Sequence, residues 1–353
     1  KFLNWYRLKQ KDIDIRKIKE KVNIFLKKNN NSNLNNIYEL MYYPIESRTD
    51  LHNLLYENNF IYLDVQQHAE TSDLIKLDII EKDNYNVVLF IPEGDKIYSN
   101  KDNIIFKICH ILQFFKILKK ELTIPKVIIF AGKQRKIFNK SDKILCSDNV
   151  NSGATSKSIN KIMIWRYEEI YKVLIHELVH YYSLDISDHF ITNKYDNLTE
   201  YIIKKYNIKY FDIPNEAITE IKTLLINSLF VSYYTNYNIS EILKYEMLFT
   251  LLQVSKILLY FSINKTCEIG LENKKINQLT AAFSYFYIKG SLIFYLDKII
   301  ENTDNYYEII MESLNNKIYL NLIDETIDII KDKYNLDENN DIMSTLRMTM
   351  FSL

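Results

Sequence analysis

The hydrophobic pattern of the 353-residue chain changes its period near residue 168. Before that point, several short runs are rich in β-branched and aromatic residues and end at turn residues, as strands do: "DLIKLDII", "NVVLFIP", "KVIIFAG" and "NKIMIWR". Beyond it, apolar residues recur with a helical period over 168–184, 215–234, 241–261, 278–300 and a final group after Tyr306. The sequence therefore predicts an α+β fold, with a small sheet in a mixed α/β N-terminal half and an all-helical C-terminal half.

We expect three segments along the chain: an N-terminal helix over 1–28, an α/β subdomain over 37–167 and a helical subdomain over 168–353. An asparagine-rich run at 29–36 separates the first two, because it breaks the helical pattern. Within the α/β subdomain the pattern also predicts helices at 48–56 and 103–120. The run "FIYLDV", residues 60–65, reads as one more strand.

Composition and charge exclude several classes of protein. Lys plus Arg and Asp plus Glu each number 45, so no excess of positive charge attracts nucleic acid. The most apolar segment, 243–263, contains Lys244, Glu246 and Lys256, which favours a buried helix over a membrane span. The cysteines are three, an odd number, and lie far apart, which predicts a reducing compartment such as the cytoplasm. We expect neither a nucleic-acid partner nor a membrane span.

The stretch "EIYKVLIHELVHYYSLD", residues 169–185, contains two of the six histidines. His176 and His180 are four residues apart, so both rings leave the same face of a helix and can bind one metal ion. Glu177 follows the first histidine and projects beside that ion, where it can hold a water molecule. The pattern His-Glu-x-x-His on an apolar helix, at the seam between the two halves, is the arrangement of zinc hydrolases. The alternative is a pair of neutral core histidines.

A catalytic zinc ion needs a third protein ligand and one open position. One family of zincins places a third histidine ten residues after the first, but Ile186 occupies that position here. Asp185, Asp188 and His189 are near in sequence, although each would have to reach back from the end of the helix.

A stronger candidate for the third ligand lies in "DIPNEAITEIKTLL", residues 212–225, where a helix is expected to begin after Pro214. Glu216 and Glu220 are again four apart, on one face of that helix. Glu216 can bind the metal, and Glu220 can accept a hydrogen bond from the distal nitrogen of a ligand histidine. The alternative is a solvated acidic first turn, which the helix dipole favours.

The motifs "HELVH" and "NEAITE" together resemble those of the gluzincins, in their thermolysin-like form. The resemblance implies a zinc ion held by His176, His180 and Glu216, with Glu220 orienting a histidine. This sequence departs from that pattern, because Glu220 replaces the usual aspartate and 36 positions separate His180 from Glu216, a longer gap. The gap is nearer to that of the clostridial neurotoxin proteases.

A looser resemblance covers more of the chain. The stretches 149–180 and 283–295, "NVNSGATSKSINKIMIWRYEEIYKVLIHELVH" and "FSYFYIKGSLIFY", are similar to metallopeptidase-like proteins encoded by giant nucleocytoplasmic DNA viruses. This resemblance implies a viral protein that acts in the infected host cytoplasm or in the virion.

Both resemblances imply a zinc metallopeptidase with a protein or peptide substrate, and Glu177 as general base. An edge strand before the metal helix would bind an extended peptide, and the small polar run "NSGAT", residues 151–155, suits that role or a plain surface turn. Tyr285 and Tyr287, with Lys289 nearby, are candidates to stabilise the oxyanion. The rival hypothesis is a structural or virion-associated protein that keeps the fold and cleaves nothing.

Overall fold

The structure, a computed structural model, describes residues 38–43, 51, 55, 61, 63–72, 74–80, 86–92, 96–119, 124–137, 143–185, 193–210, 212, 214–301, 306–333 and 341–351. The expected N-terminal helix over 1–28 lies outside these residues. The described chain forms two compact units. The sheet unit contains the residues up to Lys136 and Val150–Leu184, and the helical unit contains Ile137–Asn149 and Asp185–Phe351. The histidine-bearing helix thus belongs with the sheet, whereas the sequence boundary at 167/168 had grouped it with the helices.

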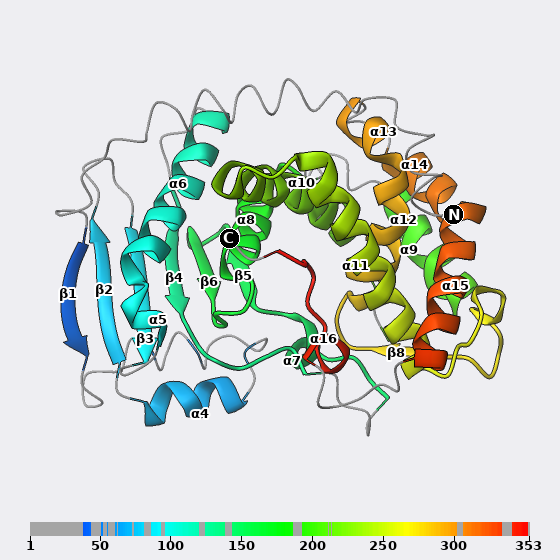
Figure 1. The fold of residues 1–353 in the computed structure, drawn as a ribbon, viewed down its shortest axis with the longest axis horizontal. Coiled ribbons are helices and arrows are strands. Elements are labelled where there is room, and N and C mark those ends of the chain that lie inside the picture. Colours follow the sequence, from blue (N-terminus) through cyan, green and yellow to red (C-terminus); the bar gives the residue numbers. More distant parts are fainter. Residues whose placement is uncertain are drawn as a thin grey trace. The chain divides into compact units, whose positions relative to one another are not determined.

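The sheet unit is built on a six-stranded sheet with the order β1-β2-β3-β4-β6-β5. Its strands are β1 (Tyr38–Tyr43), β2 (Leu74–Ile80), β3 (Asn86–Pro92), β4 (Lys126–Phe130), β5 (Gly153–Ser156) and β6 (Lys161–Ile164). β3, β4 and β6 run parallel, while β1, β2 and β5 pair antiparallel with their neighbours (Figure 1). β5 therefore lies at an edge of the sheet, and β6, which follows it in the chain, lies inside the sheet.

Within the described residues, this unit also contains the helices α4 (Leu63–Thr71), α5 (Lys96–Ser99), α6 (Lys101–Lys119) and α8 (Ile170–Tyr181). α6 joins β3 to β4, since parallel neighbours need a long crossover. Along the chain, the division between Asn149 and Val150 falls within a short helix, α7 (Ser147–Val150). The strands β2, β3, β4 and β6 and the helix α6 confirm the sequence predictions, whereas β1 was not expected.

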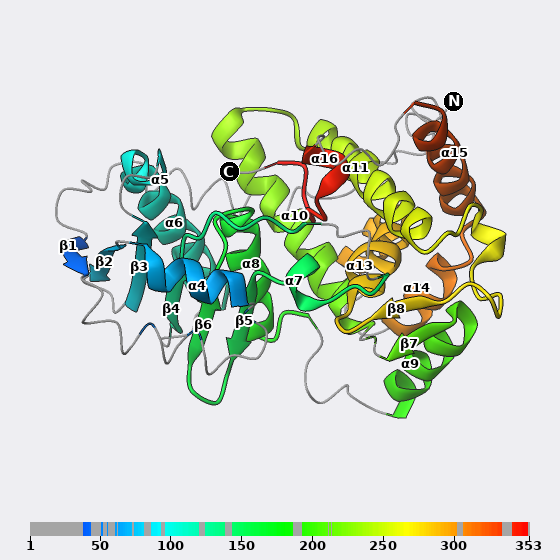
Figure 2. The same cartoon turned by 90° about the horizontal axis from the view of Figure 1, so that it is seen from below.

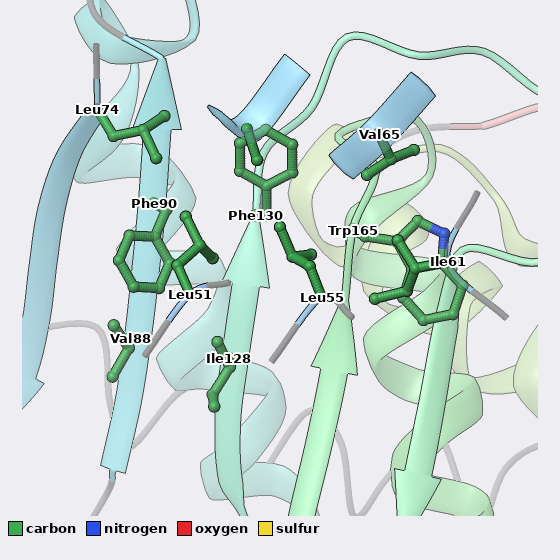
Figure 3. Packing of buried hydrophobic residues seen from close by; sticks show 11 residues of the cluster. Leu51, Leu55, Ile61, Val65, Leu74, Val88, Phe90, Ile128, Phe130 and Trp165 are labelled. Carbon is green, nitrogen blue, oxygen red and sulfur yellow. The ribbon is translucent and has the colours of Figure 1, made fainter. Parts of the chain in front are cut away.

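One face of the sheet carries a hydrophobic cluster. Phe90 of β3 and Phe130 of β4 point to this face together with Trp165, and Val65 of α4 packs against them (Figure 3). Ala154 of β5 also packs here, so its neighbours Gly153 and Thr155 point to the opposite face, where α8 lies. α6 packs against α8. Helices therefore cover both faces, which explains why the central strands are apolar throughout.

The expected strand over 60–65 is wrong, because Leu63, Asp64 and Val65 form the first turn of α4. The β-branched and aromatic residues of "FIYLDV" favour a strand locally. However, Val65 and Ala69 lie four residues apart on one helical face, and both are buried against the sheet cluster. Burial of that face outweighs the local preference, as is common for β-propensity.

The helical unit contains α9 (Asn193–Tyr206), α10 (Asn215–Thr235), α11 (Ile239–Tyr260), α12 (Lys289–Leu292), α13 (Leu296–Glu301), α14 (Tyr306–Ser313), α15 (Lys317–Lys333) and α16 (Asp341–Ser344). Three short helical turns join them: η4 (Thr266–Glu268), the π-helical η5 (Ser284–Ile288) and η6 (Ile293–Tyr295). The α+β class is confirmed. The second half is not helical throughout, because β7 (Ile208–Tyr210) pairs in parallel with β8 (Ile276–Gln278), next to α9 (Figure 2).

Two asparagines define the hairpin between α10 and α11. Asn236 ends α10 with a φ of 58°, in the left-handed region that asparagine tolerates better than most residues. The side chain of Asn238 then accepts a 2.9 Å hydrogen bond from the backbone N–H of Ser240 and caps α11. The polar residues between the two apolar runs thus end α10 and begin α11.

Two charged residues of α11, Glu246 and Lys256, face inward. Lys256 is fully buried, and its Nζ donates hydrogen bonds to the carbonyl oxygens of Ile342, at 2.5 Å, and Thr345, at 2.6 Å. Glu246 is equally buried and accepts a 3.1 Å hydrogen bond from the backbone N–H of Met350. These charges satisfy backbone groups of a buried segment near the end of the chain. The expected buried helix over 243–263 is confirmed, and no helix within the described ranges is long and apolar enough to cross a membrane.

Candidate metal centre

The helix α8 is held firmly in the sheet unit. Its residues Ile170–Val179 are all buried, including the apolar stripe of Ile175 and Val179. The helix begins after Glu169, which has a φ of 61°, and the buried Glu169 carboxylate forms a 2.7 Å ion pair with the buried Lys136. An apolar stripe in the core and a buried ion pair at the start therefore fix the position of this helix.

The imidazoles of His176 and His180 converge on one point. Their Nε2 atoms lie 3.1 Å apart, and the ring planes are inclined by 78°. Two nitrogens that each lie about 2.0–2.1 Å from a tetrahedral zinc ion would be roughly 3.3 Å apart. The observed separation is close to this value, and it also fits a hydrogen bond between two neutral rings. The pair can therefore supply two metal ligands without rearrangement of the helix.

The Glu177 carboxylate lies on the same helix, against the edge strand β5. Glu177 is only 5% exposed, and its Oε2 accepts a 2.7 Å hydrogen bond from the hydroxyl of Thr155. A Cβ at Gly153 would lie 2.7 Å from Oε1 of Glu177, so only glycine leaves room for the carboxylate in this position. The sequence had indicated a small polar run at 151–155, but it did not link that run to Glu177.

In the helical unit, Glu216 and Glu220 lie in the first two turns of α10. Glu216 is half-buried and Glu220 is completely buried. The loop before the helix is fixed by Asp212, which accepts hydrogen bonds from Gln278, at 3.2 Å, and from Ser284, at 3.0 Å. A completely buried Glu220 does not fit the alternative of a solvated acidic first turn, because a buried carboxylate needs specific partners.

The other predicted residues fall into different surroundings. Tyr287 is buried in an aromatic cluster, with its ring 4.6 Å from that of Phe283, and burial raises its pKa well above the usual value. Tyr285 is half-buried on the same π-helical turn. The buried Lys289 donates to the carbonyl oxygen of Met348 at 3.1 Å. These contacts favour core roles for Tyr287 and Lys289, and the oxyanion donor stays a prediction.

Among the alternative third ligands, only Asp185 belongs to the described residues; Asp188 and His189 lie outside them. The Asp185 carboxylate accepts a 3.3 Å hydrogen bond from Thr219 of α10, and its carbonyl oxygen accepts one from Lys222 at 3.2 Å. Asp185 therefore has structural partners within the helical unit.

Comparison with known proteins gives one partial relative. The chain is similar to "Uncharacterized protein R210" of Acanthamoeba polyphaga mimivirus, with 38% identity over 84 residues. The matched residues make up 24% of this chain and 20% of that protein, so the chain spans only a fifth of its relative's length. No family model matches the chain. No solved structure matches it either. The similarity agrees with a viral relationship and carries no information about activity.

Proposed function

We propose that the chain is a zinc-dependent peptidase of gluzincin type. The observation that supports this most is the arrangement on α8, where two imidazole Nε2 atoms lie 3.1 Å apart and the buried carboxylate of Glu177 follows the first histidine. Neutral core histidines would need no such neighbour. A zinc hydrolase of this type needs two imidazoles on one face of a helix and a carboxylate beside them.

The third ligand in this proposal is Glu216, in addition to His176 and His180. Imidazole nitrogens and a carboxylate oxygen are a donor set that suits zinc. A zinc ion bound there would lower the pKa of a water molecule toward about 7 and polarise a carbonyl group. Glu177 accepts the proton of the attacking water and transfers it to the leaving amine. Glu220 accepts a hydrogen bond from a ligand histidine and fixes its tautomer.

A peptide is the substrate that the sheet favours. β5 lies at the edge of the sheet and pairs only with β6 among the described strands. An edge strand of this kind offers unpaired backbone groups to an extended peptide, which binds through main-chain hydrogen bonds with little demand on its side chains. Its residues are also only half-buried. None of the three cysteines forms a disulfide within the described residues, and with the mimivirus similarity this supports action in an infected cell or in a virion.

The first test is metal content. The purified chain should bind one zinc ion, and His176→Ala or His180→Ala should remove it, because neither remaining ligand pair holds zinc tightly. A matched control is His110→Gln, which changes a buried histidine of α6 that is not part of the His-Glu-x-x-His motif and whose ring packs 4.1 Å from Phe106. That variant should keep its zinc. Wild-type protein that contains no zinc, prepared without chelators, would contradict the proposal.

The second test concerns the third ligand. Glu216→Gln should weaken zinc binding severely, because it removes a ligand charge. Glu220→Gln should weaken it by only roughly ten- to a hundredfold, as the loss of a group that orients a ligand does. Both affinities can be measured by competition with a zinc-binding dye. If Asp185→Asn or His189→Ala loses zinc while Glu216→Gln retains it, Glu216 is not a ligand.

A further inference from the structure

The hydroxyl of Thr155 lies against two oxygens of Glu177. Its Oγ1 is 2.7 Å from the carboxylate Oε2 and 3.0 Å from the backbone carbonyl oxygen of the same residue. A hydroxyl has one proton, and the shorter contact, to the charged group, is the stronger hydrogen bond. Thr155 belongs to β5 and Glu177 to α8, so this bond connects the edge strand to the helix that carries the histidines.

The two carboxylate oxygens of Glu177 have different surroundings. Oε2 is engaged by Thr155, whereas Oε1 makes no hydrogen bond to any residue that the structure describes. Oε1 lies over Gly153, where an added Cβ would be 2.7 Å away. Gly153 and Thr155 are two positions apart on β5, so both face α8. The strand thus holds one oxygen by a hydrogen bond and leaves space for the other.

We propose that Thr155 is a positioning residue for Glu177, and that Oε1 is the oxygen that accepts the proton. This inference rests on the proposed function, in which Glu177 is the general base. A glutamate side chain can rotate about several bonds, and a general base acts only within hydrogen-bond reach of the proton that it abstracts. The bond from Thr155 restricts that rotation. Gly153 keeps the space that the restricted carboxylate occupies.

The test compares Thr155→Val, which removes the hydroxyl but keeps the branched shape, with Thr155→Ser, which keeps the hydroxyl. Thr155→Val should stay folded and retain zinc, although its melting temperature should fall because a buried acceptor loses its donor. It should cleave a randomised peptide library roughly ten- to a hundredfold more slowly, as expected for loss of a hydrogen bond to a charged group. Thr155→Ser should restore most of the rate. Thr71→Val is the matched control, since it makes the same substitution outside the proposed site, where the Thr71 hydroxyl donates to the carbonyl oxygen of Gln67 within α4 at 2.8 Å.

A second readout does not depend on turnover. Acetohydroxamate binds zinc through its two oxygens and transfers a proton to a nearby base, so its affinity for the zinc-loaded protein reports whether Glu177 is in place. We expect Thr155→Val to weaken this affinity and Thr155→Ser to preserve it. If Thr155→Val does not fold, Gly153→Ala tests the same arrangement from the other oxygen, and it should slow cleavage with zinc retained.

Two results would overturn the inference alone: cleavage by Thr155→Val at the wild-type rate, or equal impairment of Thr155→Val and Thr155→Ser. A zinc-loaded wild-type protein that neither cleaves peptides nor binds acetohydroxamate would instead overturn the proposed function, and the inference with it. The wild-type measurements therefore separate the two failures.

Discussion

Glu177→Gln is expected to abolish peptide cleavage while zinc content and melting temperature stay close to those of the wild type. An amide cannot accept the proton of the attacking water, and a positioned general base contributes roughly 10²- to 10⁴-fold to the rate. Glutamine has nearly the same shape, and its side-chain oxygen can still accept the hydrogen bond that Thr155 donates to Oε2. The loss of cleavage activity should therefore come from the missing base and not from a change in structure.

The measurement is the rate of cleavage of a peptide library, together with zinc analysis of the same preparation. Glu200→Gln, an exposed position on α9, is a control for the removal of one negative charge. If an active wild type is found and Glu177→Gln cleaves equally fast, Glu177 is not the base. The histidines then only bind a metal, and the chemistry lies elsewhere.

The rival hypothesis, a structural or virion-associated protein, gives a different set of results. A structural zinc site has four protein ligands and no open position, so it needs no general base. A wild type that binds zinc tightly but excludes acetohydroxamate would favour this rival. The burial of Glu177 supports the proposed enzyme, because a carboxylate that is only 5% exposed is costly to keep and its hydrogen-bond donor among the described residues is the neutral Thr155 hydroxyl, not a cation.

The main elements of the fold could be predicted from the sequence where one pattern dominated. The runs that became β3 and β4 are mostly apolar because helices cover both faces of the sheet, and such runs are easy to recognise. α4 could not be predicted, because the aromatic and β-branched residues that directly precede it favour a strand, whereas its buried face, Val65 and Ala69, packs in the same hydrophobic cluster as Phe130 and Trp165. In this segment the local strand propensity and the tertiary packing favour different structures, and the packing decides which one forms.

The candidate site was predictable only in part, for a similar reason. The spacing of His176 and His180 follows from helix geometry alone, so the sequence is enough to place their rings on one face. The contacts of Gly153 and Thr155 with Glu177 depend on how β5 lies against α8, which no local pattern encodes. The small polar run at 151–155 can be recognised in the sequence, but its contact with Glu177 cannot.

The buried ion pair at the start of α8 should also give a large effect, this time on stability. Lys136→Met would leave the Glu169 carboxylate buried without its 2.7 Å partner, and stranding one member of a buried pair costs about 3–5 kcal/mol. Burial lowers the pKa of Lys136 and the nearby Glu169 opposes this, so each group depends on the other. Lys298→Met is the matched control, because the Lys298–Glu312 pair is about half exposed and such pairs contribute roughly 0–1 kcal/mol.

Urea unfolding followed by tryptophan fluorescence can measure this loss in the right unit, because Trp165 is buried in the same unit as the pair. The double variant Lys136→Met with Glu169→Gln should lose less stability than Lys136→Met alone, since no charge is then left stranded. Glu169 also has a φ of 61°, a conformation that costs a residue with a side chain and that its surroundings must enforce. If Lys136→Met unfolds like the wild type, the pair does not fix the start of α8, and burial of the helix alone must hold His176 and His180 in place.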